Sequence, residues 1–498
     1  MLSGENGIVR QAVESKDNTR GASAKEEIDL WISNIKMDSL TGSTTAEKQD
    51  DLLDRLVGNG TLTQEEADKL KDGETITIGK SEISLGEITG GGSGSGNGDD
   101  TTIAGKNYGT ETDITVEGTP ITVPGGATIS GIEGEYEDPD EGIVIYIIPE
   151  GEPEITDWNA DSDSNGIIDV QEKYDQFVWV PVPDAIATDD IDLATKNGNG
   201  IYPIAVAIDG TDANGLQNYR GALYNFEEDT DVDGKKYVKI TARSYSATSG
   251  LREPSAITTY DTSSYLPQVN GILNTSYNDS ASFGTVLQEQ FNEMVKKVNE
   301  NKGFWVGRYE TSGMSNSTTT SYVSSNEVKV NVVKGTTTGI NNTTWYRMYG
   351  QQKLYSKLAL GSTSLATSSM IWGSQWEQIM IWMKDVENTR VTTNGKYFVT
   401  NSVGYGNFNV SGTEEYDIAT STSGPAATGS SEYFKMKNIY DLAGNVVDWS
   451  LEADSTDLRV CRGGVYSSTD RSNTRAGYRS TLYPYYSYSD NGSRTTLY

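Results

Sequence analysis

The sequence contains no histidine and a single cysteine, Cys461, among its 498 residues. Without histidine, the chain lacks the usual general base at neutral pH and the commonest transition-metal ligand. One thiol cannot form an internal disulfide or a cysteine-based zinc site, and we expect Cys461 to be a small buried apolar residue. Long apolar runs are also missing, so we expect neither a membrane-spanning helix nor a signal peptide in the chain as given.

Positive charge is scarce as well. The chain has 39 Lys and Arg residues against 71 Asp and Glu residues, which gives a net charge of −32. Such a chain repels DNA, RNA and anionic lipid, so we predict no nucleic-acid partner. Its 53 glycines and 35% hydrophobic residues are typical of a soluble, turn-rich protein. The length suits two or three domains, and a single large mixed fold remains an alternative.

The beginning of the chain has a helical pattern. Residues 1–38 carry apolar side chains at helical spacing, at Ile28, Trp31, Ile32 and Ile35. Two shorter helices are predicted within residues 45–57 and 61–70, and Thr63 with Glu66 has the pattern of a capping box. One interpretation is a small helical hairpin with no further meaning.

The stretch Leu-Ser-Gly-Glu-Asn-Gly-Ile and the Ala-, Lys- and Glu-rich helix after it suggest a second interpretation. This pattern resembles the segment just beyond the membrane-spanning helix in type IV pilin-like proteins of Gram-positive bacteria. The resemblance implies that an apolar helix would precede Leu2 and is missing here. It also implies an extracellular location on the bacterial cell surface, with the membrane reached only through that missing helix.

Composition divides the chain into three parts. Residues 87–106 include a Gly- and Ser-rich run typical of a flexible linker, which separates a pilin-like helical region at 1–86 from a domain at 107–498. Within that domain, β-branched and aromatic runs predict strands at 142–149, 177–183, 237–245 and 303–310.

Two helices interrupt these strands. The first spans 286–303, where Leu287, Phe291, Met294, Val295 and Val298 form one apolar stripe and Gly303 is expected to end the helix. The second is predicted at 374–388. Because strands and helices do not alternate, the pattern predicts an irregular α+β domain without a parallel sheet.

The motif DSDSNGIIDVQE, at residues 161–172, has the spacing of a loop that wraps oxygen ligands around Ca²⁺. Gly166 permits the sharp turn, and the expected ligands are Asp161, Asp163, Asn165, Ile167 through its carbonyl, Asp169 and Glu172. We expect calcium to act here as a structural staple. A purely structural acidic turn is the alternative, since the flanking helices of an EF-hand are not evident and a strand-like run at 177–182 follows directly. The similar run at 229–234 predicts an ordinary turn, because Ile240 stands where the bidentate carboxylate would be needed.

Motifs of a known family occupy much of the chain from about residue 140 onward. They are GFWVGRYETS, NTTWYRMYGQQKLYSKL, SQWEQIMIW, NIYDLAGNVVDWS, LRVCRGG and AGYRS. Their order and spacing resemble the formylglycine-generating enzyme family, also called sulfatase-modifying factor domains. The resemblance implies a C-type-lectin-like fold, which is an irregular α+β architecture.

The chemistry of that family does not transfer to this chain. Its enzymes hold copper on two cysteines shortly after Arg-Gly-Gly, whereas no cysteine follows Arg462, Gly463 and Gly464 here. Related sulfoxide synthases use histidine-bound iron, and carboxylates substitute poorly for thiolate or imidazole at such metals. We therefore expect no copper, no iron and no enzymatic activity. The pair Glu414 and Glu415 offers acid–base groups for sugar hydrolysis, but with 71 acidic residues such pairs arise by chance.

The family resemblance also implies a second calcium site around Gly-Asn-Val-x-x-Trp. The matching positions are Asp441 and Asp448 through their side chains, with Gly444 and Val446 through their carbonyls. Both side-chain positions keep oxygen donors, which calcium prefers. The alternative is that both aspartates only cap turns.

The C-terminal stretch AGYRSTLYPYYSYSDNGSR contains five tyrosines among its nineteen residues. Tyr, Ser, Asn and Asp also dominate antibody-type binding surfaces, because Tyr gives a large amphipathic contact at low entropic cost. The layout resembles the variable region of proteins diversified by retroelements, which we place at 461–498. Arg462, Gly463, Gly464, Tyr478 and Arg479 would hold its loops. The predicted ligand-binding residues are Tyr466, Ser467, Ser468, Thr469, Asp470, Asn473, Tyr483, Tyr485, Tyr486, Tyr488, Asp490 and Asn491.

These patterns together predict a non-enzymatic ligand-binding protein displayed on the cell surface, a receptor or adhesin for an unknown protein or cell-surface ligand. The alternative is a structural minor pilin or pseudopilin whose C-terminal face contacts other pilus subunits. A polar loop pair that binds nothing would have the same composition. An enzyme is a third hypothesis, which copper-dependent thiol oxidation by the purified protein would support.

Overall fold

The computed structural model describes residues 49–58, 61–71, 76–78, 81–83, 103–183, 202–243, 253–254, 265–312, 330–335, 343–360, 364–390, 396–408, 424–455, 457–468 and 475–498. The chain divides between Thr101 and Thr102 into two compact units, a point that lies within the segment 87–106. The pilin-like helix predicted for residues 1–38 lies outside the described residues. Within the described part of the chain, no helix has the length and apolar character needed to cross a membrane.

The first unit contains two short helices and a hairpin. They are α2 (Gln49–Gly58), α3 (Gln64–Lys71), β1 (Ile76–Ile78) and β2 (Ser81–Ile83), with β1 and β2 antiparallel. The predicted capping box is confirmed, since the Thr63 N–H donates to Glu66 Oε2 at 2.7 Å and the Glu66 N–H donates to Thr63 Oγ1 at 3.2 Å. Leucines of α2 and α3 and isoleucines of β1 form a small core of their own.

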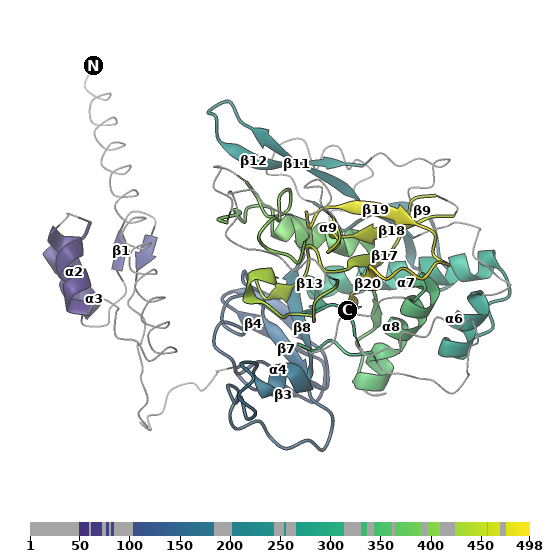
Figure 1. The fold of residues 1–498 in the computed structure, drawn as a ribbon, viewed down its shortest axis with the longest axis horizontal. Coiled ribbons are helices and arrows are strands. Elements are labelled where there is room, and N and C mark those ends of the chain that lie inside the picture. Colours follow the sequence, from purple (N-terminus) through teal and green to yellow (C-terminus); the bar gives the residue numbers. More distant parts are fainter. Residues whose placement is uncertain are drawn as a thin grey trace. The chain divides into compact units, whose positions relative to one another are not determined.

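The second unit is a mixed α+β fold built around a seven-stranded sheet (Figure 1). All of the pairings in this sheet are antiparallel. In spatial order the strands are β14 (Ser368–Met370), β21 (Thr495–Leu497), β13 (Gly303–Gly307), β8 (Asp175–Pro181), β7 (Val144–Ile147), β6 (Ala127–Ile129) and β3 (Asn107–Tyr108). The strands predicted at 142–149, 177–183 and 303–310 are thus confirmed as β7, β8 and β13.

A four-stranded sheet carries most of the C-terminal segment. Its order is β19 (Arg479–Leu482), β18 (Arg459–Arg462), β17 (Val447–Ala453) and β20 (Asn491–Ser493), in which only the β17–β20 pairing is parallel. Four antiparallel hairpins complete the β structure described here. They are β4 (Thr112–Val116) with β5 (Thr119–Val123), β9 (Ala205–Thr211) with β10 (Gln217–Gly221), β11 (Tyr224–Thr230) with β12 (Lys236–Ala242), and β15 (Lys435–Met436) with β16 (Ile439–Tyr440).

The helices of the second unit include α6, α7 and α8, which gather at one end of it (Figure 1). Its helices are α4 (Asp169–Lys173), α6 (Leu266–Leu273), α7 (Ser280–Asn301), α8 (Trp345–Ala359), α9 (Gly373–Trp382) and the 3₁₀ turn η1 (Glu432–Phe434). The helix predicted from the apolar stripe is confirmed as α7, and all five stripe residues are buried. Its predicted end is displaced by one residue, because Lys302 takes the left-handed conformation at φ 63° while Gly303 begins β13.

The N-terminus of α7 offers a direct test of a helix cap. Asp279 precedes the helix in extended conformation, and its carboxylate accepts the Ser282 N–H at 2.7 Å. Replacing Asp279 with Ala is expected to lower the free energy of unfolding by about 1 kcal/mol, because it leaves a backbone donor without its acceptor. Urea denaturation followed by tryptophan fluorescence measures the change. Asp279→Asn keeps the acceptor and should retain most of the stability; equal losses in both variants would contradict the capping role.

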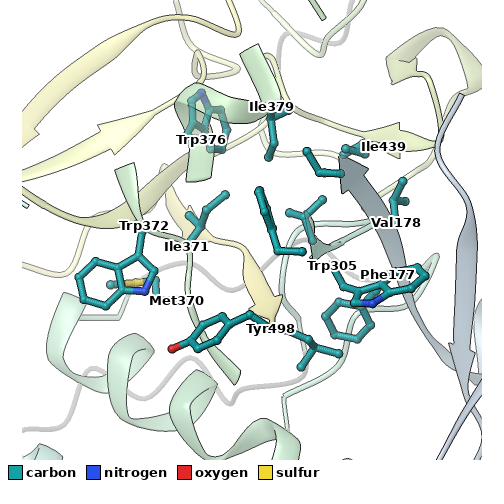
Figure 2. Close-up of a cluster of buried hydrophobic side chains, with 14 of the residues drawn as sticks. Phe177, Val178, Trp305, Met370, Ile371, Trp372, Trp376, Ile379, Ile439 and Tyr498 are labelled. Carbon is teal, nitrogen blue, oxygen red and sulfur yellow. The ribbon is translucent and has the colours of Figure 1, made fainter. Parts of the chain in front are cut away.

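The main core lies between the seven-stranded sheet and the helices. Figure 2 shows side chains from β8, β13, β14 and α9 gathered in this core together with Tyr498. The rings of Trp179 and Trp305 lie 5.1 Å apart, and Phe291 of α7 meets Trp372 edge-on at 5.0 Å. Because β21 lies inside the sheet, the last strand of the chain is part of this core.

Candidate ligand-binding surface

The tyrosine-rich loop at residues 483–490 joins the two outer strands of the four-stranded sheet, β19 and β20. Backbone contacts attach this loop to the start of α8. The Trp345 N–H donates to the Pro484 carbonyl at 3.1 Å, and Thr343 forms an isolated antiparallel bridge with Tyr488. Within the loop, the Tyr486 N–H donates to the Tyr483 carbonyl at 3.2 Å. The loop is therefore tied to the fold along its length.

Four tyrosine rings of this loop contact one another, and we call them the tyrosine surface: Tyr483, Tyr485, Tyr486 and Tyr488. Ring centroids lie 5.4 Å apart for Tyr483 and Tyr485, 4.7 Å for Tyr485 and Tyr486, and 5.8 Å for Tyr486 and Tyr488. Tyr483 and Tyr486 also meet edge-on at 5.9 Å. Such contacts hold each ring against its neighbours, so few rotamers remain to be lost on binding.

The rings are accessible to solvent to different degrees. Tyr483 is 42% exposed and Tyr486 is 50% exposed, whereas Tyr485 and Tyr488 are half-buried. Partial burial, followed by the neighbouring phenols, raises the pKa of Tyr485 and of Tyr488. These phenols therefore stay protonated at neutral pH, and each can donate as well as accept a hydrogen bond.

Two of the predicted contact residues do not belong to an accessible surface. Asn491 is 1% exposed, because it begins β20 opposite Val447, and its amide donates to the Cys461 sulfur at 3.4 Å. Ser468 is also buried, at 9% exposure, and its N–H donates to the Val465 carbonyl. The prediction that both contact a ligand is therefore wrong for the described conformation.

The remaining predicted contacts differ in exposure, and three of them lie outside the described residues. Ser467 is exposed, and Tyr466 and Asp490 are half-buried. Thr469, Asp470 and Asn473 lie outside the described residues.

A buried network of ion pairs links β18 and β19 to β17 and α9. Arg462 of β18 and Arg479 of β19 are cross-strand partners, and both pair with Glu452 of β17. Arg462 also pairs with Glu377 of α9 at 2.6 Å, and Arg479 pairs with Asp454 at 3.0 Å. Burial raises the pKa of Glu452, but the guanidinium groups of Arg462 and Arg479 outweigh it and leave that pKa lowered. Arg462 and Arg479 thus act as framework residues of the loops.

The single cysteine lies at the centre of the same sheet. Cys461 is fully buried in β18, and burial raises the pKa of its thiol well above the ordinary value. A protonated, inaccessible thiol is neither a good nucleophile nor a good metal ligand. The expectation of a small buried residue is confirmed.

The predicted calcium loop at residues 161–172 brings three carboxylates together. Oxygen atoms of Asp161, Asp163 and Asp169 all lie within 4.8 Å of one another. Gly166 provides the turn at φ 83°, as its place in the motif predicts. These observations fit a small cation bound by oxygen ligands.

Hydrogen bonds link the other expected ligands to this cluster. The Asn165 side-chain amide donates to Asp163 at 3.2 Å and to Glu172 at 3.2 Å, while its oxygen accepts the Ile167 N–H at 2.7 Å. The end of the motif forms the short helix α4 (Asp169–Lys173), and the strand expected after the motif is present as β8, which begins at Asp175. The run at 229–234 spans the end of β11 and the turn that leads to β12, so an ordinary turn is present there as predicted.

The second predicted calcium site lies at a buried turn before β17. Asp441, Gly444 and Asn445 all take positive φ angles, at 55°, 80° and 58°. Asp441 Oδ2 accepts the Gly429 N–H at 2.8 Å, and Asp448 Oδ2 accepts from Arg494 Nε at 3.2 Å. The Oδ1 atoms of both aspartates are buried and have no hydrogen-bond partner among the described residues.

Glu310, which the sequence reasoning missed, is the third carboxylate of this turn. It follows β13, is fully buried, and accepts hydrogen bonds from the Asn445 amide at 2.5 Å and the Val446 N–H at 3.1 Å. Burial and then the charges of Asp441 and Asp448 raise its pKa well above the ordinary value. Burial also raises the pKa of Asp441 and of Asp448 to about 6. Glu310 is the last residue of the strand predicted at 303–310 and lies three residues beyond the observed end of β13, so the sequence pattern did not mark it as a site residue.

Comparisons with known proteins give distant similarities only. No family model matches the sequence, and no curated protein matches it. The structure is similar to that of Treponema denticola variable protein 1, with a TM-score of 0.24 and 16% identity, covering 32% of this chain and 70% of that chain. It is also similar to PvdO from Pseudomonas aeruginosa, with a TM-score of 0.26 and 12% identity, covering 40% of this chain and 81% of that chain. Scores this low carry no argument about function, which has to be inferred from the residues of this chain.

Proposed function

We propose that the protein is a non-enzymatic binding protein whose tyrosine surface contacts a ligand. The observation that carries this proposal is the cluster of four mutually contacting rings on an anchored loop, with Tyr483 and Tyr486 close to half exposed. Large apolar rings are costly to leave in water, and clusters of them mark interaction sites on soluble proteins. The burial of Cys461 and the absence of histidine support a role in binding without catalysis.

Panning of a random peptide phage library on the full chain tests this proposal. The variant Tyr483→Ser/Tyr485→Ser/Tyr486→Ser/Tyr488→Ser serves as the matched counter-target, because it keeps the polar loop and removes the rings. We expect enriched peptides to bind the wild-type chain and to lose at least about tenfold in affinity on the variant, since aromatic anchors contribute most of the energy of such contacts. Biolayer interferometry measures both affinities.

Exposed tyrosine elsewhere on the fold provides the control. Tyr237 of β12 is 40% exposed and lies on the β11–β12 hairpin, so Tyr237→Ser should leave peptide binding unchanged. Peptides that bind the wild-type chain and the four-serine variant equally would overturn the assignment of the site.

Diversification of the tail and display on the cell surface stay predictions from the sequence. They are supported by the tyrosine-rich composition of the loop and by the resemblance of residues 2–38 to pilin-like proteins. Related genomes test the first of them: differences confined to the Tyr-, Ser- and Asn-rich stretches, beside a reverse transcriptase gene, are the expected pattern.

We further propose that calcium is a structural cofactor at residues 161–172. The convergence of Asp161, Asp163 and Asp169 supports this proposal. Asp161→Asn is expected to weaken calcium binding at least about tenfold, because one charged ligand is lost from the cluster. Isothermal titration calorimetry of the chelator-treated chain measures the affinity. Asp231→Asn, in the turn between β11 and β12, is the matched control, and an equal affinity in both variants would contradict the site.

We also propose a second calcium ion at the buried turn with Asp441, Asp448 and Glu310, whose carboxylates converge less closely than those of Asp161, Asp163 and Asp169. Two carboxylate oxygens at this turn have no hydrogen-bond partner among the described residues. Three buried acidic groups lie near the guanidinium of Arg494, so a bound cation would balance their remaining negative charge. The same cation would satisfy the unpartnered oxygens.

A further inference from the structure

The tyrosine surface continues beyond the C-terminal stretch onto the start of α6. Tyr265, the residue before that helix, is half-buried, and its ring lies 6.1 Å from Tyr485. On its other side it stacks on Tyr346 of α8, with 5.6 Å between centroids and 21° between the ring planes. Tyr346 is only 1% exposed, so it forms a fixed support under Tyr265. One ring of the surface is therefore encoded more than two hundred residues before the others.

Two carboxylates border these rings. Asp457, in the turn between β17 and β18, is exposed, and its charge acts on Tyr485. Asp490, at the end of the tyrosine loop, is half-buried, and its charge acts on Tyr488. Aromatic faces carry negative electrostatic potential, and adjacent carboxylates strengthen it. The border of the surface therefore favours a positively charged ligand.

We propose, resting on the proposed function, that this surface binds a basic segment of a protein partner through Lys or Arg side chains. A guanidinium or ammonium group lies over the ring of Tyr485, Tyr486 or Tyr265 and meets Asp457 or Asp490 at the edge. Cations are attracted to such ring faces, and arginine in particular stacks on them. The net charge of −32 draws a basic partner toward the chain over a longer range.

Phosphate-bearing ligands do not suit the same border. Asp457 and Asp490 would repel a nucleic-acid backbone or an anionic lipid headgroup. The partner is therefore a protein or peptide rather than a polyanion.

Fluorescence anisotropy with three sets of labelled peptides tests this inference. All peptides share one framework of Gly, Ser and Leu. The first set carries Lys and Arg at alternating positions, the second carries Gln there, and the third carries Glu. The full chain is titrated into each peptide at low and at physiological ionic strength. We expect the Lys and Arg set to bind best and to weaken with salt, because surface charge is screened. Asp457→Asn/Asp490→Asn should reduce its affinity about fivefold, and Tyr265→Leu by a similar factor.

Matched variants separate the border charges from general charge. Asp233→Asn and Tyr237→Ser lie on the β11–β12 hairpin and should not change the affinity. Tyr265→Leu keeps an apolar contact with Tyr346, and circular dichroism confirms that the variant is folded. One outcome is that all three peptide sets bind equally and lose binding only in the four-serine variant. This outcome would overturn the basic-partner inference and leave the proposed function standing. Absence of ring-dependent binding in every set would overturn the inference as well, while the panning experiment decides the proposed function separately.

Discussion

Replacing Arg462 with methionine is expected to lower the free energy of unfolding by about 3–5 kcal/mol. Arg462 is 1% exposed and is paired with Glu377 and Glu452, both of which are fully buried. Methionine fills a similar volume but removes the guanidinium, so Glu377 of α9 stays buried without this ion pair, while Glu452 keeps its pair with Arg479. The cost is the desolvation of that charge rather than the loss of a favourable pair alone.

Urea denaturation of the purified chain measures this change. Lys239→Met breaks the exposed pair between Lys239 and Asp229 and serves as the control, with no measurable loss expected. The double variant Arg462→Met/Glu377→Gln should recover part of the stability, because it removes the uncompensated charge. Equal stability of Arg462→Met and the wild type would contradict a charged pair between Arg462 and the buried carboxylates.

Replacing Glu253 with glutamine is expected to remove a strong pH dependence of stability. Glu253 is fully buried, and its carboxylate accepts the Gly373 N–H and, at 2.6 Å, the Ser374 N–H at the start of α9. Burial, followed by the charge of Glu452, raises its pKa from 4.5 to about 8. The folded state therefore binds a proton more tightly than the unfolded state.

The sign of the effect follows from this linkage. Stability from Glu253 is fully present below pH 4.5 and is lost as the pH rises through about 8. Relative to Glu253→Gln, the wild type should lose up to about 1.4 kcal/mol per pH unit in that window. Urea denaturation of both proteins in matched buffers, from mildly acidic to mildly basic pH, gives the difference. A difference that stays constant or grows in favour of the wild type as the pH rises would contradict a protonated Glu253.

The parts of the fold that sequence reasoning anticipated are those with a decisive apolar pattern. The stripe from Leu287 to Val298 identifies α7, and continuous β-branched and aromatic runs identify β7, β8 and β13. In contrast, α8 carries no apolar stripe. Its buried face includes Gln352, which donates to Ser493, and Tyr355, whose hydroxyl donates to Asp175 at 2.8 Å. These polar residues interrupt the apolar side chains of the same face, such as Trp345, Met348 and Tyr349, and their partners lie far away in the chain.

The candidate surface was only partly predictable for a similar reason. Composition alone marked the C-terminal stretch, but it could not separate Tyr486, which faces solvent, from Asn491, which is buried in β20. That difference depends on the parallel pairing of β20 with β17. Tyr265 and Glu310 were missed because each acquires its neighbours only when distant segments pack together.

The position of β21 between β13 and β14 has a consequence for biosynthesis. A ribosome must translate the tyrosine loop and release residues 495–497, whatever follows them, before the central sheet can close. A loop sequence that hinders this final insertion would leave the nascent chain incompletely folded and open to proteolysis. Folding itself would then select against any substitution in the loop that blocks this insertion, before the protein meets a partner.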